Sequence, residues 1–326
     1  MNIDQFKAVF PNEEACRQYL ESIIWQKGRS CPHCHDNKSY PIRGKRSRSG
    51  LYECHGCKKQ FTVTTHTPMH STKLPLWKWL LAMYYMIYSS KGISSTVLGR
   101  WIGVSQKTAW KIGHAIREMM KPSHDGDPLL TGIVELDDKY VGGKPRYQEN
   151  VANKRGRGTH KQCVLIAVQR QGSVKSSLLS GPKITDISPL MESFINKEAH
   201  LMSDNLHAFK RIGKDYAAHD SVCHSAREYV AGNIHSNTAE SFGAIIERTR
   251  QGVFHYMSKE HLSRYLNEIS FRWNHRIPKE SKKCGKRKIQ MIPMPVMDML
   301  NSLLLRAIGS QTRRLIRGGI TSVSVT

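Results

Sequence analysis

Two pairs of cysteines constrain the first part of this chain more tightly than any other feature. Cys31 and Cys34 form one C-x-x-C pair, Cys54 and Cys57 form a second, and 19 residues separate the two pairs. This spacing is typical of a zinc ribbon, in which four thiolates surround one Zn²⁺ ion as a tetrahedron. The sequence therefore predicts one structural zinc ion per chain, with short strands between the pairs; a redox-active dithiol is the alternative.

The charge of the chain indicates what kind of partner it meets. Among 326 residues, 50 are lysine or arginine and 26 are aspartate or glutamate, which gives a net charge of +24. Because this excess is spread along the chain, it favours a polyanion such as DNA, although a merely basic or ribosome-associated protein is the alternative. The sequence has neither an apolar run of about 18 residues nor a signal-peptide layout. We therefore expect a cytoplasmic, nucleoid-associated protein that does not enter a membrane.

A helical segment over residues 71–122 follows the predicted zinc ribbon. Its second half has the pattern of two helices joined by a turn that contains Gly103. A short glycine turn followed by Ser-Gln-Lys-Thr is a common start of the recognition helix in helix-turn-helix proteins. We therefore predict that Gln106, Lys107 and Lys111 face a DNA groove; an ordinary helical hairpin is the alternative.

An acidic strand opens the next segment. In Gly132–Gly143 (GIVELDDKYVGG), apolar residues alternate with Glu135, Asp137 and Lys139, the period of two expected of a strand. A buried carboxylate is costly unless a cation or a metal ion accompanies it. Asp137 is therefore a candidate metal ligand, with Glu135 on the same face and the adjacent Asp138 as alternatives.

The segment from residue 130 to 280 mixes strands with helices. Apolar alternation and turn residues predict three strands in a meander, then a helix, a strand, a helix, a strand and two long helices. This order is close to that of the ribonuclease-H-like fold. After the acidic strand, the predicted strands are 162–170, 174–179, 200–204 and 221–230, and the predicted helices are 187–195, 205–213, 237–250 and 258–275.

The motifs in this segment resemble those of insertion-sequence transposases of the DDE class, in the Merlin-like group. The matching stretches are VELDDKYVGGK around Asp137, GRGTHKQCVLIAVQR, MSDNLHAF around Asp204, and HSNTAESFGAIIERTRQGVFHYMSKEHLSRYLNEISFRWNHR around Glu240. The 35 residues between Asp204 and Glu240 are similar to the spacing familiar in that family. Two positions depart from the family's pattern: its usual Asp-Glu pair is Asp-Asp here, and Gly243 stands where tryptophan is usual.

The resemblance implies an α/β fold and a chemistry. It implies a ribonuclease-H-like mixed sheet of ISXO type flanked by helices and preceded by a zinc ribbon and an all-helical helix-turn-helix segment. It also implies that Asp137, Asp204 and Glu240 hold two catalytic Mg²⁺ (or Mn²⁺) ions, with Asp137 bridging both. The alternatives at the other two acids are a helix cap at Asp204 and the acidic member of a capping box at Glu240.

The resemblance also implies a division of the chain and a set of partners. We expect an N-terminal helix and zinc ribbon in 1–70, the helix-turn-helix in 71–122, the catalytic domain in 130–280 and a basic tail in 281–326. The expected partner is DNA, both transposon ends and target, handled by a homo-oligomer of at least two subunits. Arg248 and Arg250 are further candidates for contacts with DNA phosphates.

The expected reaction is Mg²⁺-dependent phosphodiester hydrolysis at terminal inverted repeats, followed by strand transfer from the freed 3′-hydroxyl. Two alternatives belong to other classes. One is a sequence-specific DNA-binding protein with an inactive core, which needs none of the three acids. The other is a nuclease without strand transfer, which needs the acids but not two DNA-reading modules.

Overall fold

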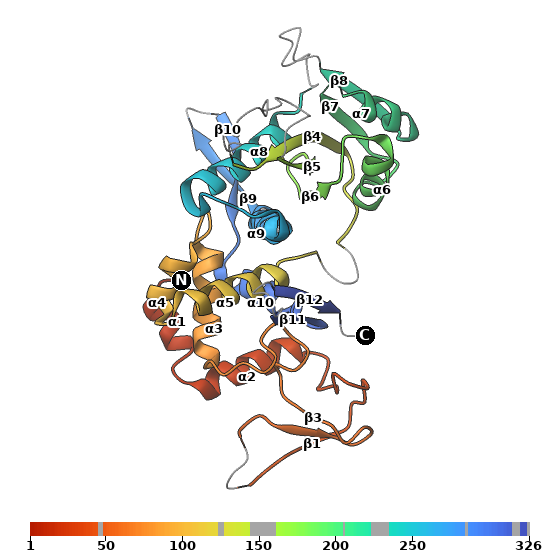
Figure 1. Cartoon of the computed structure of the whole chain (residues 1–326). Coiled ribbons are helices and arrows are strands. Elements are labelled where there is room, and N and C mark those ends of the chain that lie inside the picture. Colours follow the sequence, from red (N-terminus) through yellow and green to blue (C-terminus); the bar gives the residue numbers. More distant parts are fainter. Residues whose placement is uncertain are drawn as a thin grey trace, which may run out of the picture. The chain divides into compact units, whose positions relative to one another are not determined.

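The chain forms two compact units. The computed structural model describes residues 1–44, 48–122, 127–143, 161–204, 206–222, 235–283, 286–314 and 320–324. One unit combines Met1–His124 with Met294–Thr326, and the other is Asp125–Pro293. Figure 1 shows the elements of both. None of the helices in these described ranges has the length and apolar character needed to cross a membrane.

The first unit begins with two short helices and a small sheet. Helices α1 (Ile3–Val9) and α2 (Glu13–Ile24) start after Asn2 and Asn12, whose side chains accept backbone N–H groups, a role that asparagine favours. The sheet that follows is antiparallel, and it contains the short strands predicted between the cysteine pairs. Its strands are β1 (Ser39–Pro41), β2 (Tyr52–Cys54) and β3 (Gln60–Phe61).

Four further helices form the core of this unit. Helix α3 (Leu76–Tyr88) is buried around most of its circumference, as its continuous apolar sequence predicts. Helices α4 (Ser95–Ile102) and α5 (Gln106–Met119) pack against each other. The C-terminal helix α10 (Val296–Leu305) contacts α2 and α3, so the end of the chain helps to build the unit that its beginning starts. A hairpin of β11 (Ser310–Arg314) and β12 (Ile320–Ser324) follows it.

A five-stranded mixed sheet organises the second unit. Its strand order is β6-β5-β4-β7-β8. The first three strands along the chain pair antiparallel, whereas β7 and β8 run parallel to β4. This is the ribonuclease-H-like arrangement that the element order predicted. The strands are β4 (Ile133–Val141), β5 (Gln162–Gln169), β6 (Val174–Leu179), β7 (His200–Asp204) and β8 (Ala218–Val222).

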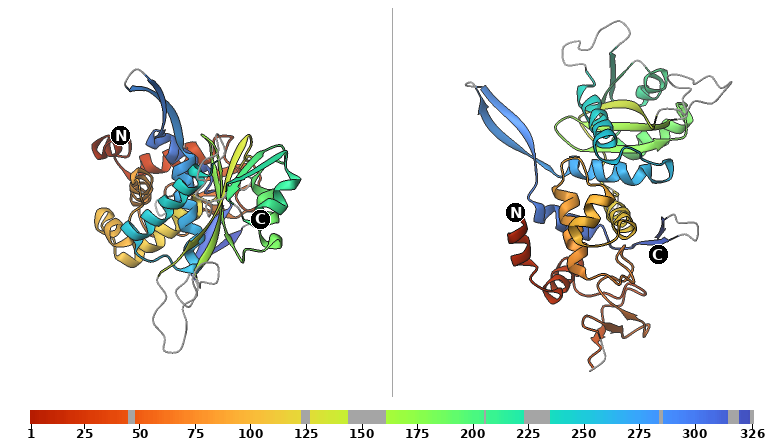
Figure 2. Two further views of the ribbon diagram at one scale, coloured as in Figure 1. Left: turned by 90° about the horizontal axis from the view of Figure 1, so that it is seen from above. Right: turned by 60° about the vertical axis from the view of Figure 1, so that its left-hand side comes forward.

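Helices cover both faces of this sheet. Apolar residues of one face pack with α6 and α7, and those of the other face pack with α8 and α9; the left view of Figure 2 shows the two layers. The helices are α6 (Ile184–Phe194), α7 (His207–Ile212), α8 (Asn237–Thr249) and α9 (Leu262–Asn274), with short helical turns at Gly213–Asp215, Arg250–Phe254 and Lys259–His261.

Two features differ from the sequence-based expectation. Strand β8 begins at Ala218, earlier than the predicted 221, and residues 223–230 of that prediction lie outside the described residues. The basic run after α9 forms an antiparallel hairpin of β9 (Arg276–Lys283) and β10 (Lys286–Pro293). The sequence did not predict this hairpin, because lysine is depleted in strands and its many lysines interrupt the apolar alternation.

Candidate catalytic and metal-binding sites

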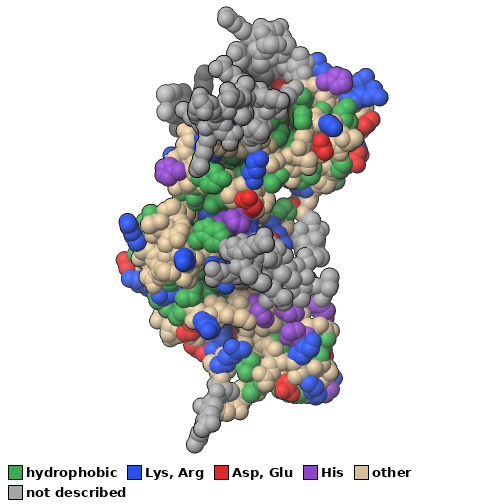
Figure 3. Space-filling view, in the orientation of Figure 1, with side chains coloured by type: hydrophobic (Ala, Val, Ile, Leu, Met, Phe, Trp, Pro, Cys, Tyr) green, Lys and Arg blue, Asp and Glu red, His purple; other side chains and the backbone are tan. Residues whose placement is uncertain are grey.

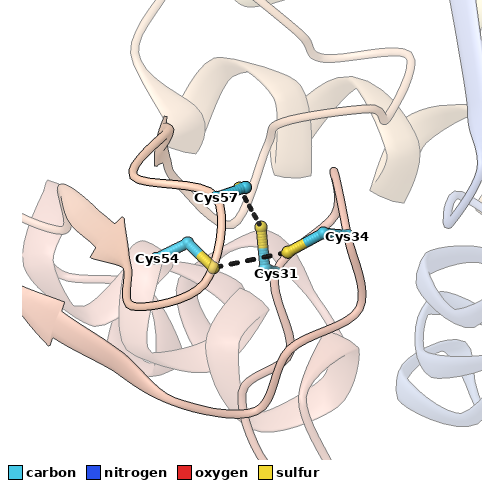
Figure 4. A group of neighbouring side chains, drawn as sticks. All are labelled: Cys31, Cys34, Cys54 and Cys57. Atoms are coloured by element: carbon cyan, nitrogen blue, oxygen red, sulfur yellow. Dashed lines mark hydrogen bonds between the residues drawn. The ribbon is translucent and has the colours of Figure 1, made fainter.

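The four predicted cysteines form one cluster. Their sulfur atoms all lie within 4.8 Å of one another, and the Sγ–Sγ distances are 3.7 Å for Cys31–Cys57 and 3.5 Å for Cys34–Cys54 (Figure 4). A tetrahedral ion with Zn–S bonds of about 2.3 Å requires sulfur–sulfur distances of about 3.8 Å. The cluster therefore fits a structural zinc ion.

The chemistry of the cluster also calls for a cation. Burial raises the pKa of the Cys31 thiol to about 12, so the thiolate that binds a metal would not form there at neutral pH without one. Both knuckles have the same turn. The backbone N–H of His35 donates to Cys31 O, that of Lys58 donates to Cys54 O, and both donor residues have left-handed backbones. The two halves of the site are thus built alike.

Strand β4 divides its residues between the two faces of the sheet. Val134 and Leu136 pack with α6 and α7, so alternation places Glu135, Asp137 and Lys139 on the face covered by α8 and α9. The predicted separation of Asp137 from the apolar residues is therefore present. Asp138 belongs to the opposite face.

The neighbouring strand β7 places a second acid beside Asp137. Parallel pairing of β4 with β7 runs from Ile133 opposite His200 to Leu136 opposite Ser203. The next residue on each strand is an acid, Asp137 on β4 and Asp204 on β7. Since paired strands lie about 4.8 Å apart, Asp137 in the middle of β4 and Asp204 at the carboxyl end of β7 are neighbours on two adjacent parallel strands.

Helix α8 carries the third acid across the same face. A Cβ atom added to Gly243 would lie 3.6 Å from Asp137 Oδ2, so the helix passes directly over that carboxylate. Glu240 is one turn earlier, and residues three apart share a side of a helix. Glu240 is exposed to solvent, as a group that receives a large substrate must be.

The electrostatics of Asp137 link the three acids. Burial raises the pKa of Asp137 to about 7, and the charges of Asp138, Asp204 and Glu240 add to the rise, while Lys139 opposes it. The acids are more loosely arranged than the thiols: across the described ranges, the four cysteines are the one group of metal-binding side chains within 4.8 Å of one another. A carboxylate whose ionisation is opposed by neighbouring acids, as that of Asp137 is, is suited to a divalent cation.

The capping alternatives for two of the acids find little support. Asp204 Oδ1 accepts the Leu206 N–H at 3.2 Å, but α7 starts later, and no side chain caps it. At α8 the N-cap residue is Ser236, with no side-chain capping bond. The capping-box alternative for Glu240 is therefore wrong, because another residue satisfies the N-terminus of this helix.

That residue is Glu135, whose role the sequence did not reveal. It is fully buried. Its carboxylate accepts hydrogen bonds from backbone N–H groups of α8 and forms an ion pair with Arg170. The sequence suggested it only as an alternative metal ligand. Its position on a buried strand face did require a cation nearby, but the cation comes from the end of β5. His235, two residues before the start of α8, is half-buried beside Glu135.

Lys139 explains the unusual glycine on α8. The Cβ atom of any larger residue at position 243 would lie 3.0 Å from Lys139 Cδ. The alkyl chain of Lys139 therefore fills the space beside Gly243, where the family usually has tryptophan. Its positive charge acts on both Asp137 and Glu247.

The predicted DNA-reading residues lie on exposed helical surface. Gly103 ends α4 with a left-handed backbone (φ +63°), and α5 follows at once. Gln106, Lys107 and Lys111 are exposed near the start of α5, and Gln106 donates a hydrogen bond to Ser95 Oγ at 2.8 Å. The two helices and the glycine turn are as predicted; whether they read DNA stays a prediction.

The two arginines of α8 and its extension differ in availability. Arg248 is exposed, and its Nε donates to Ala244 O of the preceding turn. Arg250 is instead paired with Glu247, which lowers the pKa of that carboxyl to about 2. Arg248 is therefore the better placed of the two for a contact with phosphate.

Comparisons with known proteins agree with this architecture. Residues 129–274 match the ISXO2-like transposase domain, and residues 11–60 match the transposase zinc-ribbon domain. The second unit therefore contains a DDE transposase catalytic domain, a kind of polynucleotidyl transferase. The chain belongs to the ISXO2-like (IS1595) transposases with an N-terminal zinc ribbon.

Two individual proteins are also similar. A protein in the transposable element ISH50 of Halobacterium salinarum is 27% identical over 278 residues, which cover 81% of this chain and 91% of that protein. The crystal structure of the Mos1 strand transfer complex is similar over 60% of this chain and 76% of that chain. Its sequence identity is 13% and its TM-score 0.24, too low to carry an argument.

Proposed function

We propose that this protein is the transposase of an insertion sequence, and that Asp137, Asp204 and Glu240 are its catalytic residues. The observation that carries the proposal is the environment of Asp137. Its carboxylate shares one sheet face with Asp204 and lies beneath α8, and the charges of both other acids raise its pKa. This environment supports a shared site to which three separate elements would each contribute one carboxylate.

The donor set suits Mg²⁺ or Mn²⁺. When bound, a pair of such ions would neutralise charge on the phosphate and on the attacking and leaving oxygens. Asp137, on whose pKa both other acids act, would hold these ions together with Asp204 and Glu240. Lys139 lies on the same sheet face, and its ammonium group would attract a DNA phosphate.

The reaction would proceed as two displacements at phosphorus. In the first, the oxygen of water attacks, the bond to the 3′ oxygen breaks, and a free 3′-hydroxyl and a 5′-phosphate result. In the second, that hydroxyl attacks a phosphorus of target DNA and displaces its 3′ oxygen. The exposure of Glu240 supports such a site, because a bulky duplex must reach the acids.

Binding of the element's ends is assigned to the first unit. Lys107 and Lys111 are exposed on α5, and with Gln106 they would contact the terminal inverted repeats. Lysine and arginine side chains are spread over the face drawn in Figure 3 rather than gathered in one patch, which supports sequence-independent contacts with duplex DNA elsewhere. Because transposition joins two ends, we propose a homo-oligomer of at least two subunits.

The direct test is cleavage of a duplex that carries the end of the element, with Mg²⁺, by the wild type and by Asp204→Asn. We expect the variant to cleave at least about 100-fold more slowly, because removal of one ligand weakens the binding of the catalytic ions. Its affinity for the duplex should be unchanged.

Asp220→Asn is the matched control, since Asp220 lies on the adjacent strand and pairs with His200 instead. Equal cleavage by wild type and Asp204→Asn would refute the assignment. Joined products with target DNA distinguish a transposase from a nuclease without strand transfer. Binding without cleavage by the wild type would instead indicate a DNA-binding protein with an inactive core.

A further inference from the structure

A buried ion pair lies beneath the three acids. The Glu135 carboxylate is fully buried, and its Oε1 atom lies 2.6 Å from Arg170 Nε. Glu135 belongs to β4, and Arg170 follows the last residue of β5. Removing two charges from water is costly, and a pair of buried residues that only stabilised the fold could be replaced by apolar ones. The other contacts of the pair indicate what it does.

Glu135 holds the beginning of α8. Its Oε2 atom accepts the backbone N–H of Thr238 at 2.6 Å and that of Ala239 at 3.1 Å, and its Oε1 atom accepts the Thr238 hydroxyl at 3.1 Å. The first N–H groups of a helix have no partner within it, and a negative charge there is favourable. Since α8 has no side-chain cap of its own, the carboxylate from β4 fixes both its end and its direction.

Arg170 ties the remaining elements to the same point. One of its terminal nitrogens lies 2.9 Å from Met202 Sδ on β7, 3.0 Å from His235 O and 3.1 Å from His235 Nδ1. His235 directly precedes Ser236, the N-cap residue of α8. The guanidinium group therefore connects β7 with the segment that leads into α8.

The contacts follow one rule. The pair holds each of the three elements two residues before its acid: Glu135 precedes Asp137 on β4, Met202 precedes Asp204 on β7, and Thr238 precedes Glu240 on α8. On a strand, residues two apart share a face, so Glu135 lies on the face of Asp137 and Met202 on that of Asp204. On α8 the contact at Thr238 instead holds the first turn of the helix, which contains Glu240.

We infer that Glu135 and Arg170 are positioning residues that fix the mutual placement of the three acids. This inference rests on the proposed function, in which those acids hold divalent cations. Neither residue touches substrate. Their effect is on how well the acids bind metal, and it differs from a general effect on the stability of the fold.

The test measures Mn²⁺ binding by calorimetry in the absence of DNA, on the zinc-loaded full chain. Glu135→Gln puts an amide NH₂ where an oxygen now accepts, so at least one donor of α8 or Arg170 loses its partner. Changes behind metal ligands typically weaken metal affinity about 10–100-fold, and we expect that range here. The half-saturating Mg²⁺ concentration for cleavage should rise by a similar factor, and saturating Mg²⁺ should restore most of the rate.

Glu268→Gln is the matched control. Glu268 is also a buried carboxylate, 1% exposed and paired with Arg272 on α9 of the same unit. The Glu268→Gln variant should bind Mn²⁺ with an affinity within about twofold of the wild-type value, even if its melting temperature is lower. Thr238→Val, which removes only one hydrogen bond to Glu135, should weaken Mn²⁺ binding in the same direction by less, and it decides the matter if Glu135→Gln does not fold.

Wild-type Mn²⁺ affinity in Glu135→Gln, or equal weakening in Glu268→Gln, would overturn the inference. A failure of the proposed function has a different signature. In that case Asp137→Asn would bind Mn²⁺ as the wild type does, and Glu135→Gln would still accelerate amide hydrogen exchange at residues 238–240, because the capping contacts do not depend on metal.

Discussion

At the scale of single residues, Asp137 is the group whose surroundings oppose its own charge most clearly. It is half-buried on β4, and the charges of Asp138, Asp204 and Glu240 all oppose its ionisation. A carboxyl group whose ionisation is opposed by burial and by neighbouring negative charges lowers the stability of the metal-free protein. A cation that binds there recovers that free energy, so destabilisation without metal and affinity for metal have the same cause.

The raised pKa of Asp137 predicts that the stability of the metal-free protein depends on pH. The pKa of Asp137 is about 7 in the folded state and about 3.9 in an unfolded chain. Between these values the folded state holds a proton that the unfolded state has released, so the free energy of unfolding falls as pH rises and levels off above pH 7. Asn does not titrate, so the free energy of unfolding of Asp137→Asn should not fall in this way. Relative to the wild type it should rise by about 2–4 kcal/mol across this pH window.

Urea unfolding at pH 5.5, 6.5 and 7.5, without divalent ions beyond the bound zinc, measures this difference. Comparison at each pH cancels the shared effect of pH on the zinc ribbon. Asp220→Asn is the control, because Asp220 is more exposed and pairs with His200. A constant difference between Asp137→Asn and wild type at all three values would contradict the account.

At the scale of elements, the zinc ribbon depends on its metal more than on its packing. Its strands are two or three residues long, and its buried cluster consists chiefly of Cys31, Cys54 and Phe61. A segment this small cannot bury enough apolar surface to fold alone. The ion is therefore expected to supply most of the folding free energy of residues 29–61.

Removal of the metal should unfold this element selectively. We expect one zinc per chain in the wild type and none in Cys31→Ser, measured by atomic absorption. Limited proteolysis should then cut between residues 29 and 61 at least tenfold faster, while amide exchange in β4 and β5 is unchanged. Cys16→Ser is the control, since Cys16 is buried on α2 away from the cluster. Zinc retained by Cys31→Ser would contradict this view of the ribbon.

Most elements were predictable because their signals are local. Asn12 caps α2, Gly103 ends α4, and the period of two in β4 is read directly from the sequence. The position of Asp137 on the sheet follows from the same alternation. These features depend on neighbours within a few residues of one another.

Other features were not predictable because they depend on distant residues. The N-terminus of α8 is capped by Glu135, 103 residues earlier than Thr238, so the capping box considered as the alternative role of Glu240 is absent. The space beside Gly243 is filled by Lys139 from another element. The basic hairpin of β9 and β10 gave no apolar alternation, and the packing of α10 on α2 and α3 brings together the two ends of the chain.

At the scale of the whole molecule, the proposed function would divide its two tasks between the two units. The first carries the zinc ribbon and the proposed DNA-reading helices α4 and α5, and the second carries the proposed catalytic acids. The net charge of +24 is a property of the whole chain, and it favours a polyanion at every stage of the proposed reaction. Only the acids distinguish a transposase from a protein that merely binds DNA.

The most direct measurement is therefore the anomalous diffraction of Mn²⁺ in crystals of the wild type. The account predicts manganese peaks beside the middle of β4 and the carboxyl end of β7, with oxygens of Asp137, Asp204 and Glu240 all within about 2.3 Å of an ion. Absence of manganese there at millimolar concentration, or ions held without one of these three acids, would contradict the account.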